Sequence, residues 1–427
     1  MATIRPFTGL RFSAAAGPSA DLVAPPYDVI SPSEREQFAS KNPHNVVRLT
    51  LPESEPDDRS KFVKYARSAA RLEEWRRESV LSPEAKPAFY RYTQTFDVPG
   101  LAALERTTLV TLIKVEPYDK GVVLPHEQTF PKHKEDRLRI LEATRSHLEC
   151  IFGLYEDESG VHQMVVTAPA TEVADFVTSE DGIRHRFSVV DDAEACATLS
   201  QALEPKTVWI ADGHHRYETA LAFREQLGPR DGLVPEDFMM MALCSIDDPG
   251  LVLLPTHRIL KRMNGTVADL KAGLAEHFSL TEAPNGMLMA GIAEIKATTG
   301  GQAFGVALPG GTGLVAVAKD PAALAASIAD GRSARLAGLD VSVLHDYIFA
   351  KVLGLTGHDF FDYTRIEEEA VGSVESGAPA AFLMNPPSVE DMRLIALGGE
   401  KMPQKSTYYY PKLLSGLVVW SLKDFDA

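Results

Sequence analysis

Residues 207–221, TVWIADGHHRYETAL, decide the organisation of this chain. They begin with an apolar, β-branched run at 207–211, a pattern that predicts a buried strand. Asp212 then occupies the expected N-cap position of a helix, and Gly213 permits a tight turn. The apolar face of the residues that follow predicts a helix, and Gly228 is placed to end it. We therefore expect a strand–turn–helix unit with a short polar corner.

The corner of this unit carries three cation-forming residues in the first turn of the helix, His214, His215 and Arg216. Backbone N–H groups at a helix start attract anions, whereas positive side chains there oppose the helix dipole. An anionic partner such as a phosphate would resolve this conflict. A capped helix start with solvated polar residues is the simpler interpretation for helices in general. Three such residues in a row, directly after a strand–Asp–Gly turn, favour the phosphate site.

The composition limits the class of protein. The chain has 427 residues, of which 45% are hydrophobic and 24% charged, as is ordinary for a globular protein of two or more domains. Its formal net charge of −16 argues against a general nucleic-acid binder, because such proteins need a basic face. No apolar run reaches the roughly 18 residues that span a bilayer, and the N-terminus lacks the apolar segment of a secretory signal. We expect a cytoplasmic protein that binds neither nucleic acid nor membrane.

The cysteines suggest no metal site. Cys150, Cys196 and Cys244 lie far apart and form no CxxC pair. We expect reduced thiols in the core rather than zinc ligands.

Two further loops carry polar residues that suit phosphate chemistry. Pro125 and Pro131 bracket the first, and Pro131 is expected to open a helix to about residue 148. The glycine pair at 398–399 and Pro403 fix the second. A lysine beside hydroxyls and backbone amides is an anion cradle in principle, although an ordinary exposed loop is the simpler interpretation of that segment alone. The polar residues of the two loops are His126, Glu127 and Gln128, and Lys401, Lys405, Ser406 and Thr407.

Residues 24–30, APPYDVI, are expected to form a rigid loop between a strand and a helix. The proline pair fixes an extended turn, and Ser31 to Glu34 has the form of a capping box with proline at the first helical position. Tyr27 and Asp28 are candidate substrate-loop residues that either point into a site or staple the loop to the core. The residues alone slightly favour the staple.

Several other elements follow from periodicity and turn signals. Alternation predicts a strand at 45–51, and a charged amphipathic pattern predicts a long helix at 57–80. Two strands, at 87–98 and 107–115, are expected to be antiparallel, with their turn near 99–100.

Residues 265–340 are rich in alanine and glycine and are expected to form an added α+β lobe. They contain GTGLVA at 311–316, a formal GxGxxA match. Because it lies between two strand-like runs and not before a helix, it predicts a hairpin turn and no dinucleotide site. The expected fold class is α+β with a mixed-sheet core. We expect a catalytic core with an N-terminal extension at 1–257, the lobe at 258–340, and a segment at 341–427 that completes the core.

Five blocks in a fixed order make the chain resemble a known family: IRPFTGL, APPYDVI, HEQTFPKHKEDRL, ADGHHRYETAL and MPQKSTYYYPKLL, spanning residues 4–414. Through them the chain is identified as a member of the prokaryotic domain-of-unknown-function family 1015. The three polar loops also resemble, in the same order, the free-serine kinases of the ParB/sulfiredoxin superfamily. Those enzymes carry a PHEQ block, a DGHHR block and a C-terminal proline-lysine-threonine-threonine block. This second resemblance covers short islands and implies a ParB/sulfiredoxin-like nucleotide-binding region.

The resemblance implies a role for each loop. Glu127, with His126 beside it, would be the base that takes the proton from the serine hydroxyl. The corner at 212–216 would hold the nucleotide phosphates, and residues 405–407 the transferred phosphoryl group. Mg²⁺ would bridge the phosphates, with Asp212 as a ligand directly or through water. Phosphoryl transfer needs mainly positioning and charge neutralisation, which these groups can supply.

The predicted function is therefore a small-molecule kinase. It would move a phosphoryl group from ADP or ATP to a hydroxyl, with free L-serine as the leading acceptor. This hypothesis requires the three loops to form one positively lined cup with a single carboxylate facing it. The chain is longer than the serine kinases, so the acceptor, the donor nucleotide and the oligomeric state are left open.

Other activities are weighed on the same positions. Sulfiredoxins have a reactive cysteine where this chain has His214, which argues against that chemistry. ParB-type segregation proteins carry a helix-turn-helix and a basic surface, which the negative charge does not suggest. Two alternatives stay open. One is a nucleotide-sensing module without phosphoryl transfer, and the other is a metal-dependent phosphatase or nuclease that uses His214 and Glu218 on one helix face.

Overall fold

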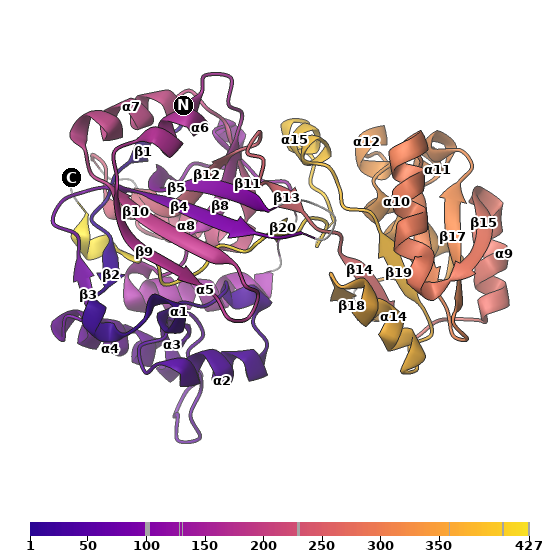
Figure 1. The fold of residues 1–427 in the computed structure, drawn as a ribbon, viewed down its shortest axis with the longest axis horizontal. Helices are drawn as coiled ribbons and strands as arrows, with labels where there is room; N and C mark the ends of the chain where they lie inside the picture. Colours follow the sequence, from indigo (N-terminus) through magenta and orange to yellow (C-terminus); the bar gives the residue numbers. More distant parts are fainter. Residues whose placement is uncertain are drawn as a thin grey trace. The chain divides into compact units, whose positions relative to one another are not determined.

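The structure is a computed structural model that describes residues 1–98, 103–127, 129, 131–228, 231–357, 359–403 and 405–425, with the side chains of 131–133 excepted. The chain divides into two compact units (Figure 1). Unit 1 comprises Met1–Pro125, Thr129–Val252 and Pro411–Ala427, and unit 2 comprises His126–Gln128 and Leu253–Tyr410. Each unit is described by itself.

The core of unit 1 is a mixed sheet, as expected. In the described residues it has nine strands in the order β6-β11-β8-β12-β5-β4-β10-β9, with β1 paired to β5. The pairs β6–β11 and β8–β12 are parallel, and the remaining pairs are antiparallel. The strands are β1 (Ile4–Arg5), β4 (Phe89–Phe96), β5 (Leu104–Lys114), β6 (Val123–Leu124), β8 (Ile151–Tyr155), β9 (Thr171–Val177), β10 (Arg184–Val190), β11 (Val208–Asp212) and β12 (Phe238–Ser245).

Helices and short strands complete unit 1. Helices α4, α5 and α8 pack in series, α4 against α5 and α5 against α8. The helices are α1 (Ser19–Leu22), α2 (Pro32–Lys41), α3 (Val47–Thr50), α4 (Val63–Arg77), α5 (Pro131–Thr144), α6 (Val161–Thr167), α7 (Ala193–Leu203) and α8 (His214–Gln226), and the short strands are β2 (Leu10–Phe12), β3 (Leu81–Pro83), β7 (Ser146–His147) and β21 (Trp420–Ser421).

Local signals predicted several of these elements. The capping box at Ser31 is confirmed, because Glu34 N donates to Ser31 Oγ and Ser31 N donates to Glu34 Oε2. The strands at 87–98 and 107–115 are confirmed as the antiparallel pair β4–β5. Their turn near 99–100 lies outside the described residues.

The predicted strand at 45–51 is wrong, because this segment forms the short helix α3. Asn45 is fully buried, and its Oδ1 accepts from Val47 N at 2.9 Å. Its Nδ2 donates to the carbonyl oxygens of Asp21 and Val23. These side-chain bonds start a helical turn that outweighs the alternating pattern. The helix predicted at 57–80 is shorter and is α4.

Unit 2 is built on an antiparallel sheet of six strands among the described residues, in the order β15-β17-β16-β19-β14-β18. Its strands are β14 (His257–Leu260), β15 (Phe278–Pro284), β16 (Ala303–Ala307), β17 (Thr312–Ala318), β18 (Phe361–Thr364) and β19 (Ala381–Met384). Its helices are α9 (Val267–His277), α10 (Leu288–Thr299), α11 (Pro321–Ile328), α12 (Ala334–Ala337), α13 (Asp340–Ser342), the π-helix η6 (Val343–Val352), α14 (Glu367–Glu375) and α15 (Val389–Leu397).

The observed units differ from the three parts expected at 1–257, 258–340 and 341–427. Strands β18 and β19 pair with β14 and β16, so residues 341–410 share a sheet with the expected lobe. The GTGLVA segment at 311–316 belongs to the hairpin of β16 and β17 and starts no helix, as predicted.

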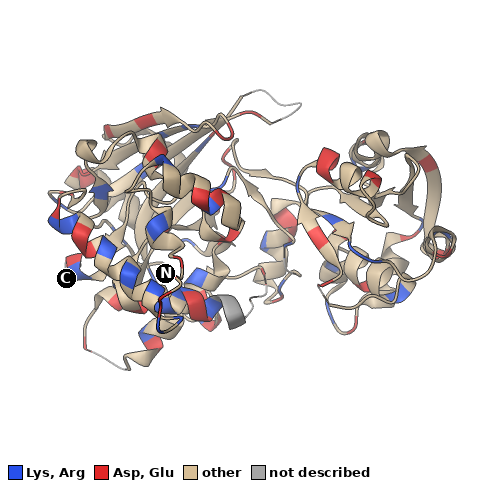
Figure 2. Cartoon of the chain, turned by 90° about the horizontal axis from the view of Figure 1, so that it is seen from below, with Lys and Arg blue, Asp and Glu red and all other residues tan. Residues whose placement is uncertain are grey.

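Charges of both signs are dispersed over the elements of the chain (Figure 2). This dispersal accompanies the net charge of −16. Within the described part of the chain, no helix combines the length and the apolar character needed to cross a membrane. The three cysteines are free thiols.

We predict that Asp248, in the turn after β12, is a large contributor to the stability of unit 1. Its side chain accepts from Thr107 N at 3.0 Å and from Gly250 N at 2.8 Å, and the residue is 4% exposed. Asp248→Ala leaves buried donors unpaired and should lower the free energy of unfolding by about 1–3 kcal/mol. Urea unfolding measures this. The neighbouring Asp247 is exposed, so Asp247→Ala should change stability by less than about 0.5 kcal/mol. Equal losses for the two variants would contradict the assignment.

We also predict that mild acid destabilises the protein through two buried histidines. His185 and His257 are each 1% exposed, and burial lowers the pKa of each imidazole to about 4. An unfolded histidine has a pKa of about 6.5. Between these values the unfolded chain binds more protons than the folded chain. The free energy of unfolding should therefore decrease as the pH falls through this window, by roughly 1–3 kcal/mol per histidine.

Urea unfolding at about pH 7 and about pH 5 tests this pH dependence. His257→Gln should reduce the loss of stability between the two conditions. His277→Gln, at a half-buried position in unit 2, serves as the control and should leave the loss as in the unsubstituted protein. The prediction would be contradicted if the free energy of unfolding fell equally between the two pH values in His257→Gln and in the unsubstituted protein.

Candidate functional site

The polar corner at 212–216 lies in unit 1 at the junction of β11 and α8. Strand β11 ends at Asp212, Gly213 is the N-cap residue in the left-handed conformation (φ 97°), and α8 begins at His214. A Cβ at Gly213 would also lie 2.6 Å from Cγ2 of Ile151, so only glycine fits. The prediction of Asp212 as the N-cap is wrong, because the left-handed residue separates it from the helix. A glycine cap offers no side chain to the first-turn N–H groups, which suits an external anion.

The carboxylate of Asp212 pairs with a lysine that the sequence analysis did not single out. Lys412 Nζ lies 2.6 Å from Asp212 Oδ2, and the two side chains are only 13% and 18% exposed. Such a shielded pair interacts more strongly than an exposed ion pair. Lys412 stands inside the conspicuous block MPQKSTYYYPKLL, but no local pattern distinguishes it from a surface lysine. The structure therefore adds a cation to the corner.

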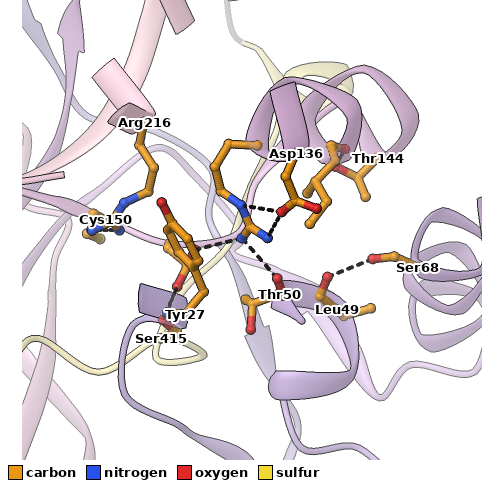
Figure 3. Close-up of polar contacts among 12 residues, drawn as sticks. Tyr27, Leu49, Thr50, Ser68, Asp136, Thr144, Cys150, Arg216 and Ser415 are labelled. Atoms are coloured by element: carbon orange, nitrogen blue, oxygen red, sulfur yellow. Dashed lines mark hydrogen bonds and ion pairs between the residues drawn. The ribbon is translucent and has the colours of Figure 1, made fainter. Parts of the chain in front are cut away.

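The cation-forming residues of the corner differ in exposure. His214 is 7% exposed, whereas His215 and Arg216 are half-buried. Arg216 Nη1 donates to the carbonyl oxygen of Cys150 at 2.6 Å, which anchors the guanidinium (Figure 3). Burial works against the charge of Arg216, but nearby carboxylates, first that of Glu149, outweigh it and raise the pKa. The corner therefore keeps a permanent positive charge.

The loop that carries Tyr27 and Asp28 lies beside this corner. Tyr27 N donates to Glu149 Oε1 at 3.0 Å. The guanidinium carbons of Arg137 and Arg216 lie 3.8 Å and 5.9 Å from the centroid of the Tyr27 ring. Figure 3 shows Tyr27 beside Arg216. Burial, followed by the charge of Asp28, raises the pKa of the Tyr27 phenol, so the phenol is neutral. Tyr27 thus staples the loop to the core and brings an aromatic face near Arg216, while Asp28 is exposed.

Glu149 joins these groups and was missed by sequence reasoning. It is 7% exposed, and its Oε1 also accepts from Ser415 Oγ at 3.1 Å. Its Oε2 lies 3.6 Å from Arg137 Nη1. Buried acids are rare unless paired, so a glutamate directly before the apolar run CIFGLY was the available signal. Its partners come from remote parts of the chain and could not be read locally.

The other two loops meet in unit 2. Lys405 N donates to Glu127 Oε1 at 2.7 Å, and Met402 N donates to the carbonyl oxygen of His126 at 2.7 Å. His126 Nε2 and Thr407 Oγ1 lie 2.9 Å apart and share a hydrogen bond. The described residues of the two loops, 126–127 with 402–403 and 405–407, therefore form one corner, although most of unit 2 lies between them in sequence. Gln128 lies outside the described residues.

The backbone at Lys405 is unusual. Its φ is 56°, a left-handed conformation that few residues other than glycine adopt. Ser406 is buried, and its hydroxyl donates to the carbonyl oxygen of Pro403. Such strained turns cluster at ligand sites. The exposed Lys405 side chain and the Ser406 and Thr407 hydroxyls thus lie on one tight turn beside Glu127.

The corner at 212–216 belongs to unit 1, and the corner formed by 126–127 and 402–407 belongs to unit 2. The expectation that all three loops form one cup stays a prediction. The structure brings together the loops that carry Glu127 and Lys405. It also places the loop that carries Tyr27 beside the corner at 212–216.

A metal site with several protein ligands is not formed by the described residues. Among them, no group of three or more His, Cys, Asp or Glu side chains is arranged to hold a metal ion. In the pair His214 and Glu218, the Glu218 carboxylate accepts from Thr129 Oγ1 at 2.7 Å and pairs with Lys134. A carboxylate with these partners is oriented by the protein and lacks the ligand set of a catalytic zinc.

Comparison with solved structures gives several weak similarities. A variant of free serine kinase in complex with ADP is 15% identical, with 70% of this chain and 87% of that chain covered, at a TM-score of 0.36. A conserved hypothetical protein from Pyrococcus furiosus is 15% identical, with 74% and 97% covered, at 0.36. C-terminally truncated SbnI from Staphylococcus aureus is 13% identical, with 74% and 90% covered, at 0.36. Similarities at this level do not identify an activity.

Sequence comparison identifies the family. No curated protein matches the chain. The model of the protein family of unknown function DUF1015 matches residues 4–342, which is most of the chain. The chain therefore belongs to the DUF1015 family.

Proposed function

We propose that the protein is a small-molecule kinase that transfers a phosphoryl group from ADP or ATP to a hydroxyl, with free L-serine as the leading acceptor. The observation that carries the proposal is the hydrogen bond from Lys405 N to Glu127 Oε1. It joins two of the three motifs that resemble those of free-serine kinases. A general base must be held within hydrogen-bond reach of the proton it takes, and a bound carboxylate oxygen fixes the orientation of the group.

The reaction follows from the chemistry of these groups. The acceptor hydroxyl oxygen forms a bond to the terminal phosphorus of the nucleotide. The bond from that phosphorus to the bridging oxygen breaks, and its electron pair stays on the departing nucleotide. The hydroxyl proton moves to the Glu127 carboxylate. Lys405 supplies positive charge for the phosphoryl oxygens, which is the main requirement of this reaction, and Ser406 and Thr407 complete the turn that would hold them.

In this proposal the start of α8 holds the nucleotide phosphates. Gly213, the N-cap residue, has no side chain that could cap the helix start. Arg216 and Lys412 add positive charge there, and His215 adds an imidazole. The Tyr27 ring near Arg216 offers a flat apolar surface beside the same corner. A helix start with flanking cations is a common phosphate site.

Mg²⁺ is part of the proposal. Magnesium usually takes one or two protein carboxylates together with the substrate phosphates, and Asp212 supplies one carboxylate at the corner. Asp212 Oδ2 already accepts a hydrogen bond from Lys412. In this proposal the substrate phosphates therefore supply most of the ligands of the ion, and Asp212 supplies at most one. Bound there, the ion would neutralise phosphate charge during transfer.

Glu127→Gln should abolish most turnover and spare nucleotide binding. Loss of a positioned base lowers the rate by about 10²–10⁴-fold, whereas glutamine keeps an oxygen for Lys405 N. Phosphorus NMR with nucleotide, Mg²⁺ and an amino-acid panel measures product, and calorimetry measures ADP affinity. Glu375→Gln, at an exposed position of unit 2, is the matched control.

The same variant separates the alternatives. A nucleotide sensor would lose neither binding nor response in Glu127→Gln. A metal-dependent phosphatase or nuclease would keep its activity in Glu127→Gln and lose it in His214→Ala. No phosphorylated product and no nucleotide hydrolysis at any pH would count against the kinase.

His215→Ala should weaken ADP binding by about tenfold or more, because a charge-assisted hydrogen bond contributes about 1.5–3 kcal/mol. His162 is a matched control, since it is also half-buried and lies in the first turn of a helix, α6. There the N–H groups of Val161 and His162 already donate to Asp157. Calorimetry should find His162→Ala within about twofold of the unsubstituted protein. Equal effects of the two substitutions would contradict the assignment of a phosphate site to the start of α8.

A further inference from the structure

Unit 2 contains a cavity of about 670 Å³, here called the unit 2 cavity. Its walls come from β14, from α12 and α13, from the residues after β19 and from the 402–406 turn. Ligand pockets in proteins commonly measure about 300–1,000 Å³ and hold drug-sized molecules. A free amino acid such as serine would fill only a small part of this space.

One wall of the unit 2 cavity is the turn that binds Glu127. Met402 and Ser406 line the cavity, and Met402 N bonds to the residue before Glu127. Arg258 lines it as well, and its Nη2 donates to the carbonyl oxygen of Lys405 at 3.2 Å. The cavity therefore shares Met402 and Ser406 with the turn that holds the proposed catalytic base, within a single unit.

Another part of the wall contains two side chains with oxygen acceptors, Gln302 and Asp340. Gln302 Nε2 donates to Asp340 Oδ1 at 3.0 Å and to the carbonyl oxygen of Gly338 at 2.9 Å. Gln302 is 7% exposed, and its Oε1 has no hydrogen-bond partner among the described residues. A buried acceptor without a partner is costly and is expected to have one in the working protein.

Asp340 adds a carboxylate to this part of the wall. Burial raises the pKa of Asp340, against the opposing effects of Gln302 and Lys296. An anion in such a place is stabilised by a partner that carries both positive charge and several donors. A protonated amine has both properties, since it can donate to Gln302 Oε1 and to the Asp340 carboxylate together.

We propose that the unit 2 cavity is the acceptor site of the kinase and that it takes an amino alcohol larger than serine, with its amine at Gln302 and Asp340. This inference rests on the phosphoryl transfer proposed above and replaces L-serine, the leading acceptor named there, with a larger molecule. The hydroxyl lies toward the Ser406 wall, where its oxygen forms the bond to phosphorus and its proton passes to Glu127. Gln302 and Asp340 both come from the alanine- and glycine-rich segment at 265–340, which thereby gains a role in acceptor selection.

The test measures binding first, without nucleotide. Ligand-observed NMR with the full chain compares aminopentanol, pentanol and L-serine. Aminopentanol should bind about tenfold or more tightly than pentanol, and Asp340→Asn should remove that difference. Asparagine keeps an oxygen for Gln302 Nε2, so the substitution removes the charge and spares the internal bond. Glu294→Gln, at an exposed position of α10 outside the cavity, is the control and should leave both affinities unchanged.

Phosphorus NMR with nucleotide and Mg²⁺ then measures transfer to the same alcohols. Phosphorylation of aminopentanol that is lost in Asp340→Asn supports the acceptor site. If serine is phosphorylated equally well by Asp340→Asn and the unsubstituted protein, the kinase stands and the acceptor assignment is overturned. If aminopentanol binds through Asp340 but no alcohol is phosphorylated, the kinase proposal fails and the amine preference of the cavity stands. Equal binding of pentanol and aminopentanol overturns the cavity proposal itself.

Discussion

The hydrogen bond between Lys405 N and Glu127 Oε1 is the constraint on which the candidate site depends. Residues 126–128 belong to unit 2, although the chain on both sides of them belongs to unit 1. The bonds of His126 to Met402 and Thr407 act at the same place. Three hydrogen bonds to one turn fix this excursion far more firmly than a single exposed contact would. The carboxylate of Glu127 is thereby placed beside the turn that carries Lys405, Ser406 and Thr407, although these residues lie far from Glu127 in the sequence.

Local sequence signals predicted what local interactions determine. The capping box at Ser31 and the strand–turn–helix at 207–221 depend on neighbours within a few residues, so their form could be read directly. The segment at 45–51 failed because the side chain of Asn45 bonds both to its own turn and to residues more than twenty positions earlier. Propensity and alternation contain no information about such remote partners.

The same limit applies to the candidate site. The resemblance of the motifs pointed to Glu127 and to the corner at 212–216, but Glu149 and Lys412 entered only with the structure. Each acts through partners far away in sequence, Glu149 through Tyr27 and Lys412 through Asp212. The organisation of unit 2 was missed for a related reason. Antiparallel pairing of β18 and β19 with β14 and β16 closes long loops, and strand patterns do not reveal which strands pair.

Arg258 is a buried cation of unit 2 that holds the turn containing Lys405. It is 1% exposed on β14, between β19 and β18, and burial lowers the pKa of its guanidinium to about 10, although Tyr363 and Glu127 act in the opposite direction. A buried cation is unfavourable unless hydrogen bonds and nearby charge offset its desolvation. Arg258 donates to the carbonyl oxygens of Thr256 and Lys405, and its guanidinium lies 5.2 Å from the centroid of the Tyr363 ring.

A leucine at position 258 would fill the same buried position in β14 without the cost of desolvating a guanidinium. The stability of β14 therefore does not account for an arginine there. A leucine could make none of the hydrogen bonds of the guanidinium, and one of these, the bond to Lys405 O, holds the left-handed residue of the turn. The amide N–H of the same residue, Lys405, donates to Glu127. Arg258 and Glu127 thus hold the backbone of one residue from its two ends, one through the carbonyl oxygen and the other through the amide. This arrangement is rigid at the point where a base and a phosphoryl-binding lysine would have to be aligned.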